Sequence, residues 1–585
     1  MRMNALRLFC LLLLLSIFMQ ARPQSALEGP ADQIFMNAVV YTGLETQAFV
    51  EEAKKKSTIL LVPANKRILR AQAIAIRGDR IIGVASNGSI QKFKGSRTKI
   101  VDLNGRFVMP GFNDAHLHLA NAGFEKVQVN LVGTKSLDEM KARIAERAKT
   151  AGPGEWLQGR GWDHTLWPNQ QLPTRQDLDA VTGDRPAIFE RVDGHIAIAN
   201  SAALRQAGIT RATADQPGGK IDRDQNGEPT GIVREKTMEA LLALVPAPTA
   251  AQRRQALELA LVELAQWGVT SAQDNSEWQD FLVFEELQRE GKLTARITEW
   301  LAFDDPLSVL EQHRAHHPAT DPMLHTGMLK GFLDGSLGSR TAALLAPYAD
   351  DPKNSGLPRY DQTTLSQMAR ARALAGFQLG FHAIGDRAVA MALEAFADAE
   401  DYVRQRAATR QPRQFRFRVE HAQVIAPPQF ARFHGLEAVA SMQPNHLLTD
   451  MNWALSRLGP ERAKTSYPWA QFLGNDVPLA FGTDYPVEPI TPFRGIYAAL
   501  TRKNESGNKE YFPEQKLDID SILIAYTRGA AYAEFAENEK GALAPGRLAD
   551  FVVLDRDITK ATPTEILKTK VLRTVVGGKT VYPAK

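Results

Sequence analysis

Short apolar runs and longer helical patterns alternate through most of this 585-residue chain. Each apolar run has the length of one strand and is hydrophobic at most positions, as expected of a parallel strand buried on both faces. The helical pattern is clearest in AAQRRQALELALVELAQ, where Leu257, Leu261 and Leu264 recur at helical spacing. Eight runs are found: the run that reaches His116, then 267–274, 295–301, 327–334, 377–382, 415–421, 437–443 and 478–484. The alternation predicts an α/β fold, a (β/α)8 TIM-like barrel built from parallel βα units.

The two ends of the chain carry a different pattern. Segments 34–105 and 536–585 contain short β-rich runs broken by Gly, Asn and Asp, such as AIAIRGDRIIGVAS and VLRTVVGGKTVY. We expect them to form the two parts of one discontinuous β-sandwich domain, with the barrel over residues 106–535 between them. Residues 119–250 are too many for a βα loop, so we expect an inserted cap over the C-terminal mouth of the barrel.

The first residues are typical of a secretion signal. Arg2 and Arg7 precede the apolar stretch from Leu8 to Met19, which is too short to span a bilayer. We expect a signal peptide over residues 1–26, cleavage that leaves no stable membrane anchor, and an exported protein, periplasmic or secreted. Cys10, the one cysteine, lies inside this stretch, so the mature chain would have neither a disulfide nor a thiolate nucleophile.

Composition narrows the class of protein. The 44% hydrophobic and 23% charged residues are ordinary for a globular protein and exclude the disordered and fibrous classes. Loss of Arg2, Arg7 and Arg22 with the leader lowers the formal net charge from +4 to +1. Such a small charge argues against nucleic acid as a partner.

Polar side chains that can bind metal stand at the ends of the apolar runs, where barrel enzymes keep their chemistry. His116 and His118 are two positions apart, so on a strand both imidazoles face the same way and can reach one ion. The other candidates at run ends are Lys330, His382, His421 and Asp484. This set predicts a site for divalent metal ions and metal-assisted hydrolysis.

One histidine in an apolar run is more often a structural residue than a ligand. The argument rests on the joint pattern, because four of the 12 histidines fall at run ends. We expect five other histidines to lie on the surface or in loops: His313, His316, His317, His325 and His434.

Seven motifs resemble one known family in content and in order: NDAHLH, RVDGHIAIANSAAL, LDGSLGSRTAAL, HAIGDRAV, EHAQ, FGTDYPV and GALAPGRLADFVVLD. From about Ile34 to the C-terminus the chain is similar to the type-3 branch of the amidohydrolase superfamily, which includes N-substituted formamide deformylases. The resemblance also implies the barrel and the sandwich from both chain ends.

The resemblance implies two divalent metal ions, with zinc expected. His116 and His118 would bind the more buried ion, and His382 and His421 the second. Lys330 would be carboxylated and bridge the two ions, while Asp484 would bind metal and move protons. An ammonium cannot ligate a cation, so Lys330 has this role only if CO2 adds to its neutral amine. Unmodified, it would be structural or substrate-binding, and the site would hold one ion.

Candidates for substrate binding lie in the expected cap and at further run ends. His195, Trp162 and Asp163 could face the substrate, but the aromatic residues could equally pack the core of the cap itself. Asp274, at the end of the second run, and Arg340, in GSLGSRTA, are weaker candidates chosen by position.

The function expected from these residues is hydrolysis of a non-peptide C–N bond, of the amide, N-acyl or formamide type, in a small-molecule substrate by a metal-activated hydroxide. One alternative is a one-metal deaminase or cyclic-amide hydrolase that uses His116, His118, His382 and Asp484. A second is a non-hydrolytic decarboxylase or isomerase, or a binding protein. The oligomeric state stays open, a homodimer included.

Overall fold

The computed structural model describes residues 29–45, 68–152, 154–191, 196–216, 219–406 and 414–583. The expected signal peptide at 1–26 and the candidate residue His195 lie outside these residues. The chain divides into two compact units. The first comprises residues up to Leu117, Glu263–Asn275 and Lys292 onward; the second comprises His118–Val262 and Ser276–Gly291.

The first unit contains the barrel. Its eight strands pair side by side in chain order, and all of these neighbouring pairs are parallel. The strands are β8 (Phe112–Leu117), β15 (Val269–Asp274), β16 (Arg296–Ala302), β17 (Leu324–Phe332), β18 (Leu379–Ala383), β19 (Arg418–His421), β20 (Val439–Met442) and β21 (Leu479–Phe481). The eight runs expected from the sequence are these strands, and the expected fold class is confirmed.

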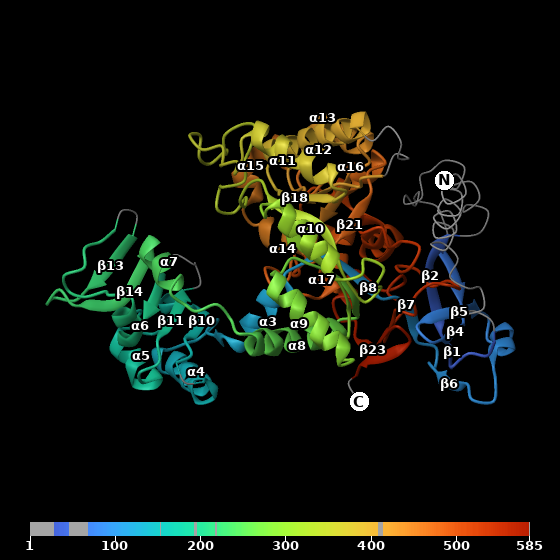
Figure 1. Ribbon diagram of the computed structural model, residues 1–585, viewed down its shortest axis with the longest axis horizontal. Coiled ribbons are helices and arrows are strands. Elements are labelled where there is room, and N and C mark those ends of the chain that lie inside the picture. The colour runs from blue at the N-terminus through green and yellow to red at the C-terminus, as the bar shows by residue number, and fades with distance from the viewer. Residues whose placement is uncertain are drawn as a thin grey trace, which may run out of the picture. The chain divides into compact units, whose positions relative to one another are not determined.

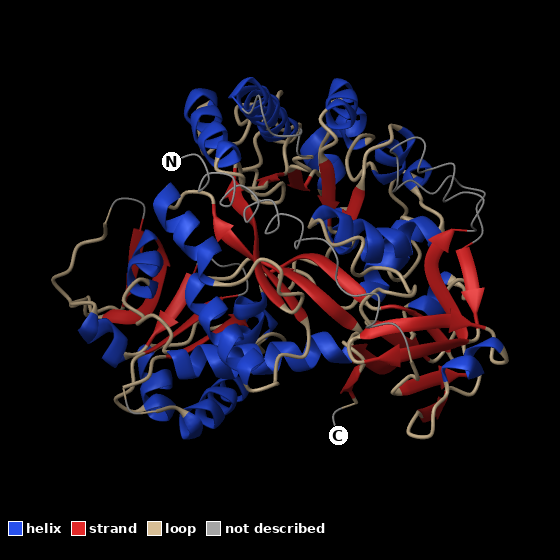
Figure 2. Ribbon diagram, turned by 45° about the vertical axis from the view of Figure 1, so that its right-hand side comes forward, coloured by secondary structure: helices blue, strands red, loops and turns tan. Residues whose placement is uncertain are grey.

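The ring nearly closes between β21 and β8. Just beyond β21, the backbone N–H of Asp484 donates to the carbonyl of His116 at 2.7 Å. Figure 2 shows the strands surrounded by helices. The helices of this unit include α10 (Leu307–His316), α11 (Gln362–Leu374), α12 (Asp386–Arg406), α13 (Pro427–Gly435), α14 (Asn445–Asp450), α15 (Ala454–Ala463), α16 (Trp469–Gly474), α17 (Pro492–Thr501), α18 (Ile519–Ile524) and α19 (Ala530–Ala533).

Both ends of the chain build the β-sandwich, as expected. One sheet contains β1 (Gln33–Met36), β4 (Ala73–Arg77), β5 (Arg80–Ala85) and β6 (Lys99–Asp102). The other contains β2 (Val39–Glu45), β3 (Ile68–Ala71), β7 (Phe107–Pro110), β22 (Phe551–Leu554), β23 (Val571–Val576) and β24 (Lys579–Tyr582), so strands from both ends lie together (Figure 1). The sheets share one core, in which the rings of Phe35 and Phe551 meet edge to face at 5.1 Å.

The second unit has its own sheet and core. Its six strands are β9 (Val129–Asn130), β10 (Leu157–Trp162), β11 (Ala187–Arg191), β12 (Ile196–Ala199), β13 (Gly219–Arg223) and β14 (Pro229–Glu235). Its helices are α3 (Leu119–Val127), α4 (Leu137–Thr150), α5 (Arg175–Thr182), α6 (Ser201–Gln206) and α7 (Lys236–Leu242), with most of α8 (Ala250–Gln266) and α9 (Trp278–Arg289).

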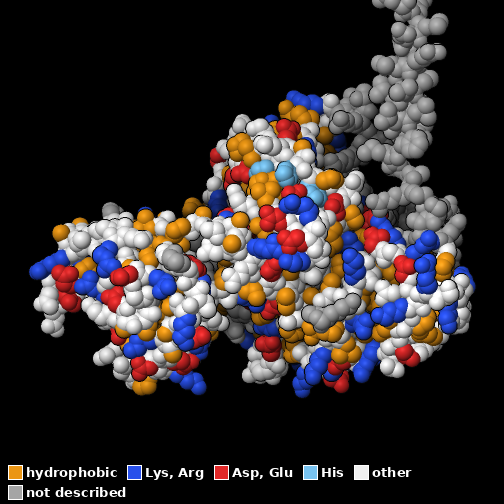
Figure 3. Space-filling model, turned by 60° about the horizontal axis from the view of Figure 1, so that its bottom comes forward, with side chains coloured by type: hydrophobic (Ala, Val, Ile, Leu, Met, Phe, Trp, Pro, Cys, Tyr) orange, Lys and Arg blue, Asp and Glu red, His pale blue; other side chains and the backbone are white. Residues whose placement is uncertain are grey.

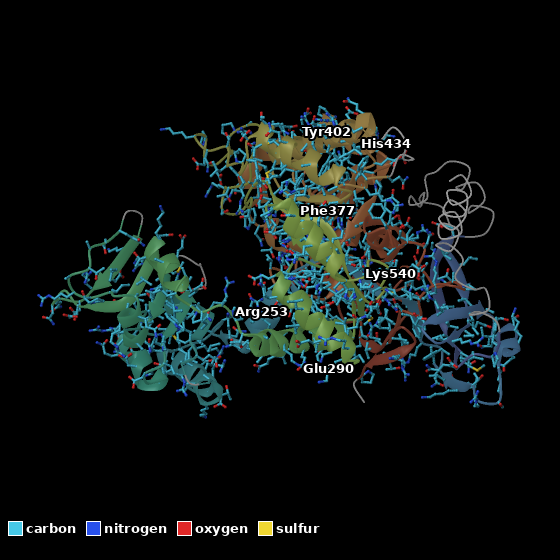
Figure 4. All side chains as sticks on the ribbon, in the orientation of Figure 1. Arg253, Glu290, Phe377, Tyr402, His434 and Lys540 are labelled. Atoms are coloured by element: carbon cyan, nitrogen blue, oxygen red, sulfur yellow. The ribbon has the colours of Figure 1, made fainter. Side chains whose placement is uncertain are left out.

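Helices α8 and α9 make this unit larger than the expected insertion 119–250. Arg253 on α8 donates to Asp280 on α9 at 2.8 Å, and Arg254 donates to Glu290 at 2.7 Å. Figure 4 labels Arg253 on α8 and Glu290, the residue that follows α9. The ion pairs fasten α9 to α8, which explains why the two helices group together.

The surface shown in Figure 3 mixes positive, negative and apolar side chains, in keeping with the small net charge. Within the described ranges, no helix combines the length and the apolar character that a membrane span requires.

Candidate metal centre

His116 lies at the C-terminal end of β8 and is fully buried. Its Nδ1 is 2.8 Å from Glu420 Oε2, and its Nε2 is 3.0 Å from Lys330 Nζ and 3.6 Å from Asp484 Oδ1. His118 follows β8 directly, and one ligand atom each from His116, His118 and Asp484 lie within 4.8 Å of one another. The expected i, i+2 pair therefore does converge with Asp484 on one small volume.

Glu420 fixes which nitrogen of His116 carries the proton. Arg418 lies two residues earlier on β19, is fully buried, and donates from Nε to Glu420 Oε1 at 2.8 Å. Its other donors reach the Ala115 carbonyl at 2.8 Å and Ser441 Oγ at 3.0 Å. A carboxylate paired with arginine accepts from His116 Nδ1–H, so the lone pair of Nε2 is directed at Lys330 and Asp484.

Lys330 is 2% exposed near the end of β17. Its Nζ lies 5.1 Å from the ring centre of Trp300 and 4.9 Å from that of Phe332. Burial among these rings lowers the pKa of Lys330 to about 8, although the carboxylates of Glu420 and Asp484 act in the opposite direction. A substantial share of neutral amine at neutral to slightly alkaline pH follows.

His382 and His421 lie at the ends of β18 and β19 with their ring centres 4.4 Å apart. Burial lowers the pKa of His382 to about 4 and that of His421 well below its usual value, and the neighbouring Lys330 acts in the same direction. Within the described part of the chain, His421 Nδ1 is buried without a hydrogen-bond partner. Neutral buried imidazoles and an unpartnered ring nitrogen are what a divalent cation requires, so these residues fit a metal site.

Two residues at or just beyond strand ends have a left-handed backbone conformation, which residues other than glycine rarely adopt. His421 has φ 70° and Asp484 has φ 59°. Alternation along a strand would send Glu420 and His421 to opposite faces, and the left-handed turn brings both toward His116. Strained backbone of this kind clusters at functional sites.

Asp114 ties the two edges of the barrel together beside the site. Its carboxylate accepts from the backbone N–H groups of His116 at 3.1 Å and Thr483 at 2.9 Å, and from Thr483 Oγ1 at 2.6 Å. Burial raises the pKa of Asp114 to about 7, an increase that these hydrogen bonds oppose. These hydrogen bonds fix the backbone at His116 relative to the backbone at Thr483, the residue before Asp484.

His446 was missed by the sequence analysis. It lies on α14, just after β20, and its Nε2 is 3.1 Å from Asp484 Oδ2. His421, His446 and Asp484 form a second group whose ligand atoms lie within 4.8 Å. Burial alone would lower the pKa of His446, but the Asp484 hydrogen bond and nearby carboxylates raise it to about 9. A signal was present, because His446 lies shortly beyond the run 437–443 and is therefore close to a run end, where the other candidates also lie.

The expectation that Trp162 faces a substrate is corrected. Trp162 is fully buried in the core of the second unit, where its Nε1 donates to the Phe189 carbonyl at 2.8 Å. Asp163 caps the short helix His164–Leu166 and pairs with Arg191 at 2.6 Å. Both residues thus make contacts that stabilise the second unit.

Asp274 and Arg340 have different surroundings. Asp274 is fully buried at the end of β15, in register with Leu117 on one side and Glu299 on the other, and so lies in the wall of the barrel. Arg340 lies in a loop with its guanidinium 3.1 Å from both carboxylate oxygens of Asp350, and its role in substrate binding stays a prediction.

Arg359 is a cation near the site that the sequence analysis did not single out. Its side chain is exposed, and its guanidinium lies 5.6 Å from the ring centre of Phe332, which is itself 5.4 Å from that of His382. The described residues give its guanidinium no hydrogen bond or ion pair.

His325 corrects the expectation of a surface or loop histidine. It lies on β17, where its Nε2 is 3.3 Å from Thr298 Oγ1, and burial lowers its pKa. The same threonine contacts Glu534, a buried carboxylate that pairs with Lys540 at 2.9 Å. Lys540 is labelled in Figure 4. His325 is therefore part of a polar cluster inside the first unit.

Comparison with known proteins places the chain in a family. The family model described as "Amidohydrolase family" matches residues 99–582. The Arabidopsis thaliana protein LONG AFTER FAR-RED 3 is 35% identical over 525 residues, which cover 88% of each chain. N-substituted formamide deformylase from Arthrobacter pascens is 26% identical over 548 residues, covering 90% of this chain and 98% of that protein.

A solved structure shares the fold. An uncharacterized metal-dependent hydrolase from Pyrococcus furiosus superposes with a TM-score of 0.73 at 29% identity, covering 90% of this chain and all of that one. With the family model matched over most of its length and imidazole and carboxylate ligands gathered at one end of its barrel, this chain belongs to the amidohydrolase family and is a hydrolase of the metal-dependent amidohydrolase superfamily.

Proposed function

We propose that this chain hydrolyses a C–N bond other than a peptide bond, of the amide, N-acyl or formamide type, in a small molecule. The observation that carries the proposal is the position of Asp484, whose carboxylate groups with His116 and His118 and also lies in a second group beside His421. A carboxylate between two imidazole groups suits a pair of ions, and imidazole ligands favour zinc.

Different residues would bind the metal ions and transfer the proton. When bound, divalent ions polarise a carbonyl and lower the pKa of a water molecule. His116 and His118, together with the neutral imidazoles of His382 and His421, would hold them, and Lys330 as a carbamate would bridge the two. Asp484 lies 3.6 Å from His116 through Oδ1, where it would accept a proton and return it to the leaving nitrogen.

Two observations guide the choice of substrate. The similarity to a formamide deformylase favours N-acyl and N-formyl amines. Arg359, exposed beside Phe332, favours substrates that also carry a carboxylate, because a guanidinium binds carboxylates well. N-formyl and N-acetyl amino acids combine both features and form the first compounds to assay.

The proposal is tested by reconstituting the purified chain with zinc and assaying N-formyl and N-acetyl amino acids, uncharged formamides, ureides and lactams. His116→Ala, matched by His434→Ala on the surface of α13, controls for contaminating activity. We expect release of an amine that needs metal and His116 but not His434. Turnover of lactams or ureides alone, with one ion per chain, would favour the one-metal alternative, and no turnover on any compound would contradict the proposal.

We also propose that the protein is exported. Arg2 and Arg7 before an apolar stretch support this, although they lie outside the described residues. N-terminal sequencing of protein from the native cell should find a start between about Arg22 and Leu27. A chain that retains Met1 in the cytoplasm would contradict export.

A further inference from the structure

Asp484 presents its two carboxylate oxygens to different partners. Oδ1 lies 3.6 Å from Nε2 of His116, on the side of the expected metal ligands. Oδ2 lies 3.1 Å from Nε2 of His446. His446 and His116 thus contact different oxygens of the Asp484 carboxylate.

His446 is itself confined. The residue is 9% exposed, and its Nδ1 is 4.0 Å from Glu488 Oε1, within ion-pair range. Glu488 is 6% exposed and accepts from Thr449 Oγ1 at 2.6 Å and from Arg494 Nη1 at 2.9 Å. The imidazole therefore stands between two carboxylates, of which the outer one is fixed by hydrogen bonds.

We propose that His446 is a positioning residue for Asp484, and that Glu488 orients His446 in turn. The inference rests on the proposed function, in which Asp484 moves the proton. By donating from Nε2 to Oδ2, His446 restrains rotation of the carboxylate and keeps Oδ1 directed at the ligands around His116. A carboxylate free to turn would present either oxygen, and proton transfer depends on that geometry.

The competing role for His446 is that of a metal ligand, since its ring atoms group with His421 and Asp484. A ring nitrogen that carries a proton and donates it to a carboxylate has no lone pair with which to bind an ion. Nε2 of His446 already lies at hydrogen-bond distance from Asp484, whereas Nδ1 of the buried His421 has no hydrogen-bond partner among the described residues. The contacts therefore favour His421 as a metal ligand and His446 as the residue that positions Asp484.

The test compares His446→Ala and His446→Gln with His434→Ala, a histidine variant at the exposed surface of α13. Ions per chain, the visible spectrum of the cobalt(II)-substituted protein, and kcat and KM are measured for each variant. We expect His446→Ala to keep the wild-type ion content and KM while kcat falls by about 10–100-fold. Glutamine can still donate to Oδ2, so His446→Gln should retain more activity, and added imidazole should partly restore His446→Ala.

Three outcomes would overturn the inference. Loss of one ion in both His446 variants would make His446 a ligand. An unchanged kcat in His446→Ala would remove any role. The third is an unchanged cobalt spectrum in His446→Ala, because a released Asp484 must alter the field at the ion. The cobalt spectrum reports the position of Asp484 even if no amide is turned over. Failure of the proposed activity can therefore be distinguished from failure of this inference.

Discussion

Lys330 offers the sharpest test of a two-ion site. Carbamate formation joins the carbon of CO2 to the neutral Nζ and releases a proton, so its extent follows the neutral fraction of the amine. With the pKa lowered from 10.5 to about 8, the neutral fraction at pH 7.5 rises from about 0.1% to about 24%, roughly 240-fold. Burial against Trp300 and Phe332 thus prepares this lysine for CO2 far better than a surface lysine.

The perturbation is removal or replacement of the amine. Lys330→Ala should lose metal and activity together, and acetate or propionate should partly restore both by supplying a carboxylate in the vacated space. Lys330→Arg should not be restored, because guanidinium keeps its charge and cannot be carboxylated.

The assay follows reactivation of metal-free protein by zinc in buffers of fixed dissolved CO2. Below pH 8 the rate should rise about tenfold per pH unit, because only the neutral amine reacts, and it should level off above pH 8. Carbon-13 bicarbonate should give a carbamate signal in the wild-type protein and none in Lys330→Ala.

Reactivation that ignores CO2 would refute the reasoning. So would one ion per chain beside an unmodified Lys330 at high bicarbonate. Either result would promote the one-metal alternative, in which this lysine binds substrate or supports the fold.

Other variants probe the remaining parts of the site and fold. His116→Ala and His118→Ala should each lose at least one ion and the activity but stay folded by circular dichroism; a double variant with wild-type metal content would contradict the site. Glu420→Gln should weaken zinc binding by about 10–100-fold in chelator competition, because the paired carboxylate that orients His116 is lost. Glu534→Ala leaves Lys540 buried without its partner, so the free energy of unfolding in urea should fall by about 3–5 kcal/mol, and an unchanged midpoint would argue against a buried pair. Arg359→Gln should raise KM about tenfold for N-acyl amino acids and leave KM for uncharged formamides unchanged, and equal effects on both would exclude carboxylate recognition.

The barrel could be predicted because its strands are buried on both faces and read as continuous apolar runs. The run expected at 295–301 is β16, Arg296–Ala302, and that expected at 377–382 is β18, Leu379–Ala383. One polar residue at the end of such a run is usually structural, so His382 and Asp484 could be selected from sequence only because several run ends carry such residues together.

The inserted unit could not be predicted at the level of its side chains. An aromatic residue such as Trp162 has the same local sequence whether it packs a core or lines a binding site. The outcome depends on Phe189 in another strand, whose carbonyl accepts the indole N–H. No local pattern encodes that contact.

His325 and His446 show where reasoning from strand ends succeeds and fails. The strand near Lys330 was expected to start at 327, but β17 starts at Leu324, so His325 lies inside the barrel wall and meets a cluster around Glu534 from near the C-terminus. That contact is long-range and leaves no trace in the local pattern. His446, by contrast, lies a few residues beyond the end of β20, so it is close to a strand end like the other candidates although it was not selected. The position relative to the strand is the more general signal, since it selects ligands and the residues that orient them alike.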